Sequence, residues 1–87
     1  MKIVKIGALW CPACLIVNNS LDKLKKVYDI EIENIDYDFE EDKVKEYNVG
    51  DTLPVLVFIK DKKEVDRLIG EKTYEEIEGV INKHEKI

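Results

Sequence analysis

Hydrophobic and polar positions change their period twice within the first third of the chain. Residues 2–8 mix isoleucine and valine with lysine in the short alternation of a strand. From Cys11 to about residue 27 the apolar positions recur every three or four residues, which predicts a helix with one buried stripe. That stripe comprises Cys14, Val17, Leu21, Leu24 and Tyr28, with Leu15 and Val27 widening it.

A second strand and a short helix are predicted next. Residues 30–35 alternate again and run into an acidic segment, residues 36–42. A parallel crossover from the first strand through the helix to this strand makes a βαβ unit. Asp38-Phe39-Glu40-Glu41 has the form of a capping box, so we expect a helix over roughly residues 39–47.

The second half of the chain predicts two strands and a closing helix. Residues 55–59 are continuously apolar, as in a central strand covered on both faces. Residues 61–63 form a polar turn into an antiparallel edge strand over residues 64–69. Thr73-Tyr74-Glu75-Glu76 offers another capping box. The last helix should bury Ile77, Val80 and Ile81.

Composition adds limits to this pattern. The chain has 87 residues, 45% of them hydrophobic and 38% charged, which indicates one globular domain over residues 1–87. The formal net charge of −5 argues against nucleic acid or an anionic membrane as partner. The N-terminus alternates charged and apolar residues and resembles no signal peptide. We therefore expect a monomeric, cytoplasmic protein without a membrane partner.

The candidate chemistry lies in Leu9-Trp10-Cys11-Pro12-Ala13-Cys14-Leu15, which holds both cysteines and the single tryptophan. Two cysteines three apart can form a disulfide when the first lies at a helix entry and the second one turn further on. Pro12 suits the first turn of a helix, where its missing N–H has no helical partner. The free N–H groups and the helix dipole there favour a thiolate, so we expect an exposed Cys11 to be the nucleophile. Cys14 should be more buried and should resolve a mixed disulfide.

With these elements in place, the sequence resembles the thioredoxin and glutaredoxin superfamily from Ile3 to about Lys83. The resemblance implies an α/β minimal thioredoxin fold of order βαβαββα, with a four-stranded mixed sheet and three helices. The chain begins at the strand that bears the motif, so in length it is similar to a glutaredoxin. The matching segments are Trp10-Cys11-Pro12-Ala13-Cys14, Asn34-Ile35-Asp36, Lys45-Glu46-Tyr47-Asn48-Val49, Leu53-Pro54 and Ile69-Gly70.

The resemblance also implies an activity, the reduction of protein disulfides by dithiol exchange without a bound cofactor or metal. Cys11 would attack the substrate disulfide and Cys14 would complete the exchange. Pro54 matches the family's cis-proline, and Leu53 would offer its backbone to an extended substrate. Electrons would come from NADPH through a thioredoxin reductase. The residues expected to contact substrate are Trp10, Pro12, Leu53, Pro54 and Gly70.

Three positions depart from the family's patterns. Lys5 stands where thioredoxins carry a buried acid, six residues before the first cysteine. Leu9 stands where glutaredoxins commonly carry a basic residue, and Gly70-Glu71-Lys72-Thr73 lacks their glycine pair followed by an acid. Glutathione is therefore the less favoured electron donor. The Pro12-Ala13 pair between the cysteines matches neither group and leaves the direction of electron flow open, with reduction preferred in a cytosolic setting.

Other functions remain open from sequence alone. One alternative is metal binding, with Cys11 and Cys14 as half of a zinc site, for which His84 is the only other soft or borderline ligand in the sequence. Two copies of the chain would pool four cysteines around zinc or an iron–sulfur cluster. The remaining alternatives are a glutathione-dependent glutaredoxin and a redox-inert module that binds peptides.

Overall fold

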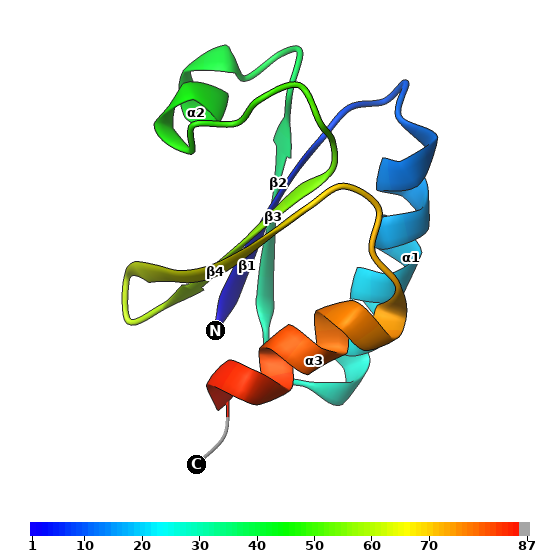
Figure 1. The fold of residues 1–87 in the computed structure, drawn as a ribbon, viewed down its shortest axis with the longest axis vertical. Helices are drawn as coiled ribbons and strands as arrows, with labels where there is room; N and C mark the ends of the chain where they lie inside the picture. Colours follow the sequence, from blue (N-terminus) through cyan, green and yellow to red (C-terminus); the bar gives the residue numbers. More distant parts are fainter. Residues whose placement is uncertain (86–87) are drawn as a thin grey trace.

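The computed structural model describes residues 1–85 of the protein and contains seven elements (Figure 1). Strands and helices alternate through the first four elements, and a hairpin and a helix complete the chain. This is the predicted order βαβαββα. The elements are β1 (Lys2–Gly7), α1 (Pro12–Val27), β2 (Glu31–Asp36), α2 (Glu41–Glu46), β3 (Val55–Lys60), β4 (Lys63–Ile69) and α3 (Tyr74–Glu85).

The four strands form one mixed sheet in the order β2-β1-β3-β4. β1 and β2 run parallel, with Ile3 opposite Ile32, so the βαβ prediction is confirmed. β3 runs antiparallel to β1, with Val57 opposite Val4, and β4 runs antiparallel to β3 at the edge. The strand that leads into the cysteine motif, β1, is therefore central, with a neighbour on each side.

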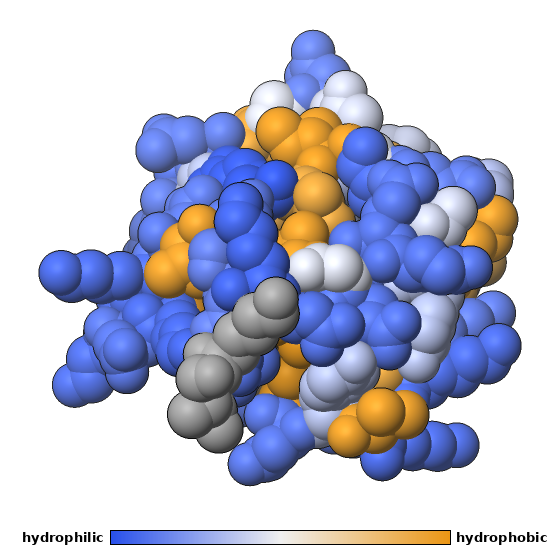
Figure 2. Space-filling view, turned by 60° about the horizontal axis from the view of Figure 1, so that its bottom comes forward, coloured by the Kyte–Doolittle hydropathy of each residue, from blue (hydrophilic) through white to orange (hydrophobic). Residues whose placement is uncertain are grey.

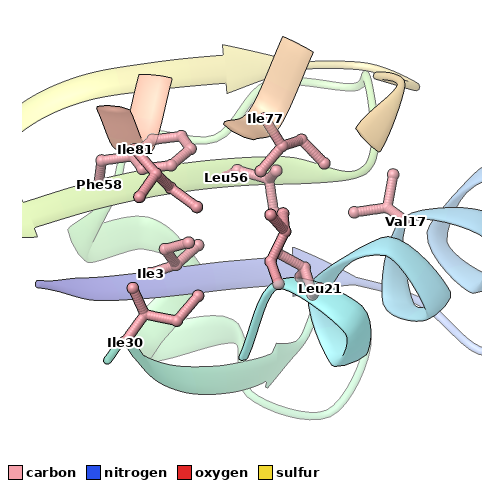
Figure 3. Packing of buried hydrophobic residues seen from close by; sticks show 9 residues of the cluster. Ile3, Val17, Leu21, Ile30, Leu56, Phe58, Ile77 and Ile81 are labelled. Atoms are coloured by element: carbon pink, nitrogen blue, oxygen red, sulfur yellow. The ribbon is translucent and has the colours of Figure 1, made fainter. Parts of the chain in front are cut away.

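One face of the sheet packs against α1 and α3. Figure 3 shows Val17 and Leu21 of α1 and Ile77 of α3 directed toward the same part of the sheet. Ile3, Leu56 and Phe58 meet them from β1 and β3, and this is the larger of the two main cores. The periodicity predicted these contacts, because each helix presents one apolar stripe.

The opposite face packs against α2 and the loops that flank it. Its buried residues include Val4, Ile6, Val55 and Val57 from the two central strands and Val44 from α2. Both faces of β1 and β3 are thus covered, as expected for the continuous apolar run of residues 55–59. Any side chain in the middle of β1 is consequently buried, whatever its polarity.

Two residues expected at the edges of the α1 stripe lie in solvent. Leu15 and Val27 are exposed, whereas Cys14, Val17, Leu21 and Leu24 are buried. The prediction for Leu15 and Val27 was wrong because a single helix packed on a sheet buries only the stripe that faces it.

The acidic turn before α2 differs from the predicted capping box. The Asp36 carboxylate accepts the backbone N–H groups of Asp38 and Phe39, at 2.9 and 3.1 Å. The Glu40 carboxylate accepts the N–H of Asp36 at 2.8 Å, and Glu40, the helix N-cap residue, makes no side-chain cap bond. The helix accordingly begins at Glu41 instead of residue 39, since Asp36 uses these N–H groups in a local turn.

The last two elements agree with the sequence. Asp61 and Lys62 have φ values of 54° and 66°, the left-handed conformation that a tight two-residue hairpin turn requires. Thr73 Oγ1 accepts the N–H of Glu76 at 3.1 Å, which confirms the predicted cap of α3. Ile77 and Ile81 are buried, and Val80 is partly buried.

The surface is strongly polar at the end of the molecule where α3 finishes. Figure 2 shows hydrophilic side chains over most of this face, with apolar groups visible between them. Among residues 1–85, no helix combines the length and the apolar character needed to cross a bilayer.

Candidate redox site

The two cysteines lie at the start of α1, where β1 has just ended. Cys11 is the N-cap residue, and Pro12 is the first residue of the helix, as predicted. Cys11 Sγ accepts the backbone N–H of Cys14 at 3.2 Å. An N–H directed at sulfur gains energy when the sulfur carries negative charge. The helix start therefore orients a donor toward the first cysteine.

Cys11 is nevertheless less accessible than the sequence suggested. It is 6% exposed, and together with Ala8 and Cys14 it forms a small buried cluster. The expectation of an exposed Cys11 was wrong because the loop from Ala8 to Cys11 folds back, with the Cys11 N–H bonded to the Ala8 carbonyl at 3.2 Å. A partner must approach closely to reach this sulfur.

Cys14 is the more deeply buried cysteine, as predicted for the resolving thiol. Only 1% of it is exposed. Burial, and next its hydrogen bond with Cys11, raise the pKa of the Cys14 thiol to about 11. The Ala8 backbone N–H and the Lys5 ammonium group act in the opposite direction and lower that pKa. At neutral pH Cys14 is a thiol that must lose its proton before it attacks.

Leu53 and Pro54 lie beside the cysteine pair. The Leu53-Pro54 peptide bond is cis, which confirms the preference for a cis-proline at Pro54. The Leu53 side chain packs against the cluster of Ala8, Cys11 and Cys14. Leu53 precedes β3, so its backbone lies outside the paired part of that strand.

Gly70 is connected to the site through Pro54. Its N–H donates to the Pro54 carbonyl at 2.8 Å, and its φ of +91° strongly favours glycine. A Cβ atom at this position would meet only Thr52 Cγ2, at 3.7 Å. Backbone conformation, not crowding, therefore explains why glycine suits this position.

Trp10 lies on the surface next to Cys11 and is held by an acid that the sequence did not single out. Its indole N–H donates to the Asp38 carboxylate at 2.7 Å, although 63% of Trp10 is exposed. The sequence identifies residues 36–42 as an acidic segment and gives Asp38 no role beyond a helix cap. One of its members in fact fixes the tryptophan beside the motif.

Apolar side chains surround this end of the molecule. Leu9 and Phe39 are about four-fifths exposed, at 80% and 79%, and Leu15 is 57% exposed. Leu9 and Leu15 flank the cysteine motif in sequence, and Phe39 follows the acid that holds Trp10. Exposed apolar side chains that gather into one contiguous patch are typical of surfaces that contact other proteins.

Within β1, Lys5 is the charged residue closest to the two cysteines. It is only 7% exposed. Burial lowers the pKa of its ammonium group, whereas negative charge on Cys14 and on Cys11 would raise it. The sequence marked Lys5 as a departure from thioredoxins but gave no reason to expect it to be buried against the thiols. That burial follows from helices on both faces of the sheet.

The structure gives no support to a metal site built on the cysteine pair. Within residues 1–85, histidine, cysteine and acidic side chains form no group of three suited to a metal ion. His84 Nε2 instead lies 3.1 Å from the Asp66 carboxylate, between α3 and β4. The pairing of His84 with the cysteines is thus not observed.

The fold and the cysteine pair at the start of α1 place the protein in the class of thioredoxin-fold dithiol proteins. The family model described as thioredoxin matches residues 1–83, so the chain belongs to the thioredoxin family. It is 35% identical to Thioredoxin H8 of Arabidopsis thaliana over 97% of its own length. It is 30% identical to the thioredoxin of Chlamydia caviae, covering 97% of this chain and 82% of that protein.

Solved structures agree on the fold. A mutant thioredoxin from Halobacterium salinarum superimposes with a TM-score of 0.92, covering 99% of this chain and 75% of that one, at 21% identity. The chain spans 56% of the length of Thioredoxin H8.

Proposed function

We propose that the protein is a thiol-disulfide oxidoreductase that reduces disulfides in other proteins through Cys11 and Cys14. The observation that carries this proposal is the asymmetry of the pair at one helix start. Cys11 accepts a backbone N–H at the N-cap, while Cys14 is buried behind it. A nucleophile and a waiting thiol need these two environments.

The exchange proceeds in two displacements. The Cys11 thiolate attacks one sulfur of the substrate disulfide, and the other substrate sulfur leaves as a thiolate and takes up a proton. Cys14 then loses its proton and attacks Cys11 Sγ, which breaks the mixed disulfide and releases the second substrate thiolate. Two electrons pass to the substrate, and the Cys11–Cys14 disulfide remains.

The surroundings of the pair suit a protein substrate. Leu53 lies against the cysteine cluster with its backbone outside the β3 ladder, where an extended segment has room to pair with it. Trp10, held by Asp38, precedes Cys11, Pro12 lies between the two cysteines, and the Gly70 N–H donates to the Pro54 carbonyl. We assign substrate contact to these residues.

Electron supply and location complete the proposal. A bound cofactor is not required for dithiol exchange, and reducing equivalents would come from NADPH through a thioredoxin reductase in preference to glutathione. A cytoplasmic, monomeric protein with disulfide-containing protein partners fits the low cysteine content and the net charge of −5.

An insulin-disulfide reduction assay with three electron sources tests this function. We expect turnover with dithiothreitol and with NADPH plus thioredoxin reductase, and little with glutathione plus its reductase. Cys11→Ser should abolish turnover because it removes the nucleophile. Coupling to glutathione alone would overturn the proposed donor, and full activity of Cys11→Ser would overturn the function.

A further inference from the structure

Lys5 extends from the middle of β1 toward Cys14. It shares the α1-facing side of the sheet with Ile3 and Gly7, because alternate residues of a strand point the same way. A Cβ atom built on Gly7 would lie 3.0 Å from Cys14 Sγ and 3.2 Å from Lys5 Nζ. Sulfur and amino nitrogen therefore lie against the same point of β1. The absence of a side chain at Gly7 leaves the space that both occupy.

No carboxylate within residues 1–85 forms an ion pair with Lys5. Asp36 and Glu40 line the same hollow of about 250 Å³ as Lys5 and Cys14, but both are engaged elsewhere. Asp36 accepts two N–H groups of its own turn, and Glu40 accepts the Asp36 N–H and pairs with Lys43. The residues opposite Lys5 in the sheet, Asn34 and Leu56, are uncharged.

A buried ammonium group without a carboxylate is costly unless another negative group compensates it. The two thiols are the remaining groups near Lys5 that can become negative. Of these, the Cys14 sulfur lies with the Lys5 amino nitrogen against Gly7. Asn18 and Asn34 also line the hollow, which is not enclosed from solvent. Water there can receive a proton that leaves Cys14.

Resting on the proposed dithiol exchange, we propose that Lys5 is the charge partner of Cys14 and stabilises the thiolate that resolves the mixed disulfide. The proton of Cys14 passes to water in the hollow, and the thiolate forms beside the Lys5 ammonium group. Its electron pair then forms the bond to Cys11 Sγ as the bond from Cys11 to the substrate sulfur breaks. Lys5 itself neither gains nor loses a proton in this step.

The effect on rate follows from the thiolate population. Burial holds the pKa of Cys14 at about 11, so only a small fraction is thiolate at neutral pH. Loss of an opposite charge at this range raises a thiol pKa by about one unit. The thiolate fraction then falls about tenfold, while a more basic thiolate attacks somewhat faster, so the net loss is about threefold.

A stopped-flow reaction with 5,5′-dithiobis(2-nitrobenzoate) separates the two cysteines. Attack by Cys11 releases the first nitrothiobenzoate, and attack by Cys14 on the mixed disulfide releases the second. Lys5→Met keeps the length and the apolar stem but removes the charge. We expect the second phase to slow about threefold at pH 7 and the first phase to change less, because the charge of Lys5 acts more strongly on Cys14 than on Cys11.

Lys2→Met is the matched control, because it removes a positive charge from the same strand at a residue that pairs with Glu33 away from the cysteines. It should leave both phases unchanged. An unaltered second phase in folded Lys5→Met would overturn the role of Lys5. Absence of the first phase in the unsubstituted protein would instead contradict the proposed function itself.

A second measurement needs no substitution of Lys5. In the Cys11→Ser protein, the ¹³Cε signal of Lys5 is followed through alkaline pH, with and without Cys14→Ser. Coupling is reciprocal, so the Cys14 thiolate should raise the pKa of Lys5 relative to the protein that lacks it. Identical Lys5 titrations in the two proteins would overturn the proposal.

Discussion

Cys11 and Cys14 are three residues apart, yet their sulfurs lie in different surroundings. Cys11 caps the helix and accepts an N–H, whereas Cys14 is enclosed between α1 and β1 beside Ala8 and Lys5. A single residue change at the end of β1 can therefore act on one sulfur and leave the other alone. Gly7 is such a residue, since a Cβ there would crowd Cys14 Sγ.

Ionisation of Cys14 should make the stability of the reduced protein depend on alkaline pH. Its pKa is raised to about 11 in the folded chain, above the ordinary value of about 8.5 in an unfolded one. The contribution is fully present below pH 8.5 and is lost as the pH rises toward 11, because the unfolded chain gives up the proton first. In Cys11→Ser, burial still raises the Cys14 pKa although the contribution of the Cys11 thiol is lost, so we expect the unfolding free energy to fall by about 1 kcal/mol between pH 8.5 and pH 10.

Denaturant unfolding of Cys11→Ser and of Cys11→Ser with Cys14→Ser measures this effect. The double variant has no thiol and serves as the control for every other alkaline titration. Parallel pH profiles for the two proteins would contradict the raised pKa.

The sequence predicted only some of the residues that form the site. The cysteine spacing and Pro12 identified the helix start, and Leu53-Pro54 identified the neighbouring cis-proline. The bond between Trp10 and Asp38 joins residues 28 apart, and no local pattern indicates it. The burial of Lys5 depends on helices covering both faces of β1, so it too required the assembled fold.

At the level of elements, periodicity was sufficient because each helix and strand has one dominant way to bury its apolar residues. The bounds of α1, the start of α3 and the run of β3 agree with the pattern. Errors arose where a polar side chain had two possible uses. Asp36 bonds N–H groups of its own turn and displaces the predicted capping box of α2. A separate error concerns Leu15, which lies on the outer side of α1 because the helix buries only the stripe that faces the sheet.

The cap of α3 offers a test at this scale. Thr73 Oγ1 accepts the Glu76 N–H, so Thr73→Ala leaves an N–H at the helix start without its side-chain partner. We expect a loss of about 1 kcal/mol in the unfolding free energy, measured by chemical denaturation. Thr52→Ala is the matched control, because Thr52 is exposed and lies outside every helix. Equal losses of unfolding free energy in the two variants would show that the Thr73 cap does not stabilise the helix.

Across the whole molecule, the sheet brings three distant segments to one end. The loop after β1 carries the cysteines, the loop before β3 carries Leu53 and Pro54, and the turn after β2 carries Asp38. β1 and β3 are adjacent and antiparallel, so the end of one lies beside the start of the other. This topology assembles a redox site from segments that lie far apart in sequence.

The central claim is that Cys11 attacks substrate and Cys14 resolves the product, and trapping the mixed disulfide tests it most directly. Reduced Cys14→Ser and Cys11→Ser proteins are each mixed with an oxidised protein substrate, and the adducts are identified by mass spectrometry under non-reducing conditions. We expect Cys14→Ser to accumulate a disulfide through Cys11 and Cys11→Ser to give none. Adducts of equal yield through Cys14 in Cys11→Ser would contradict the assignment of the two thiols.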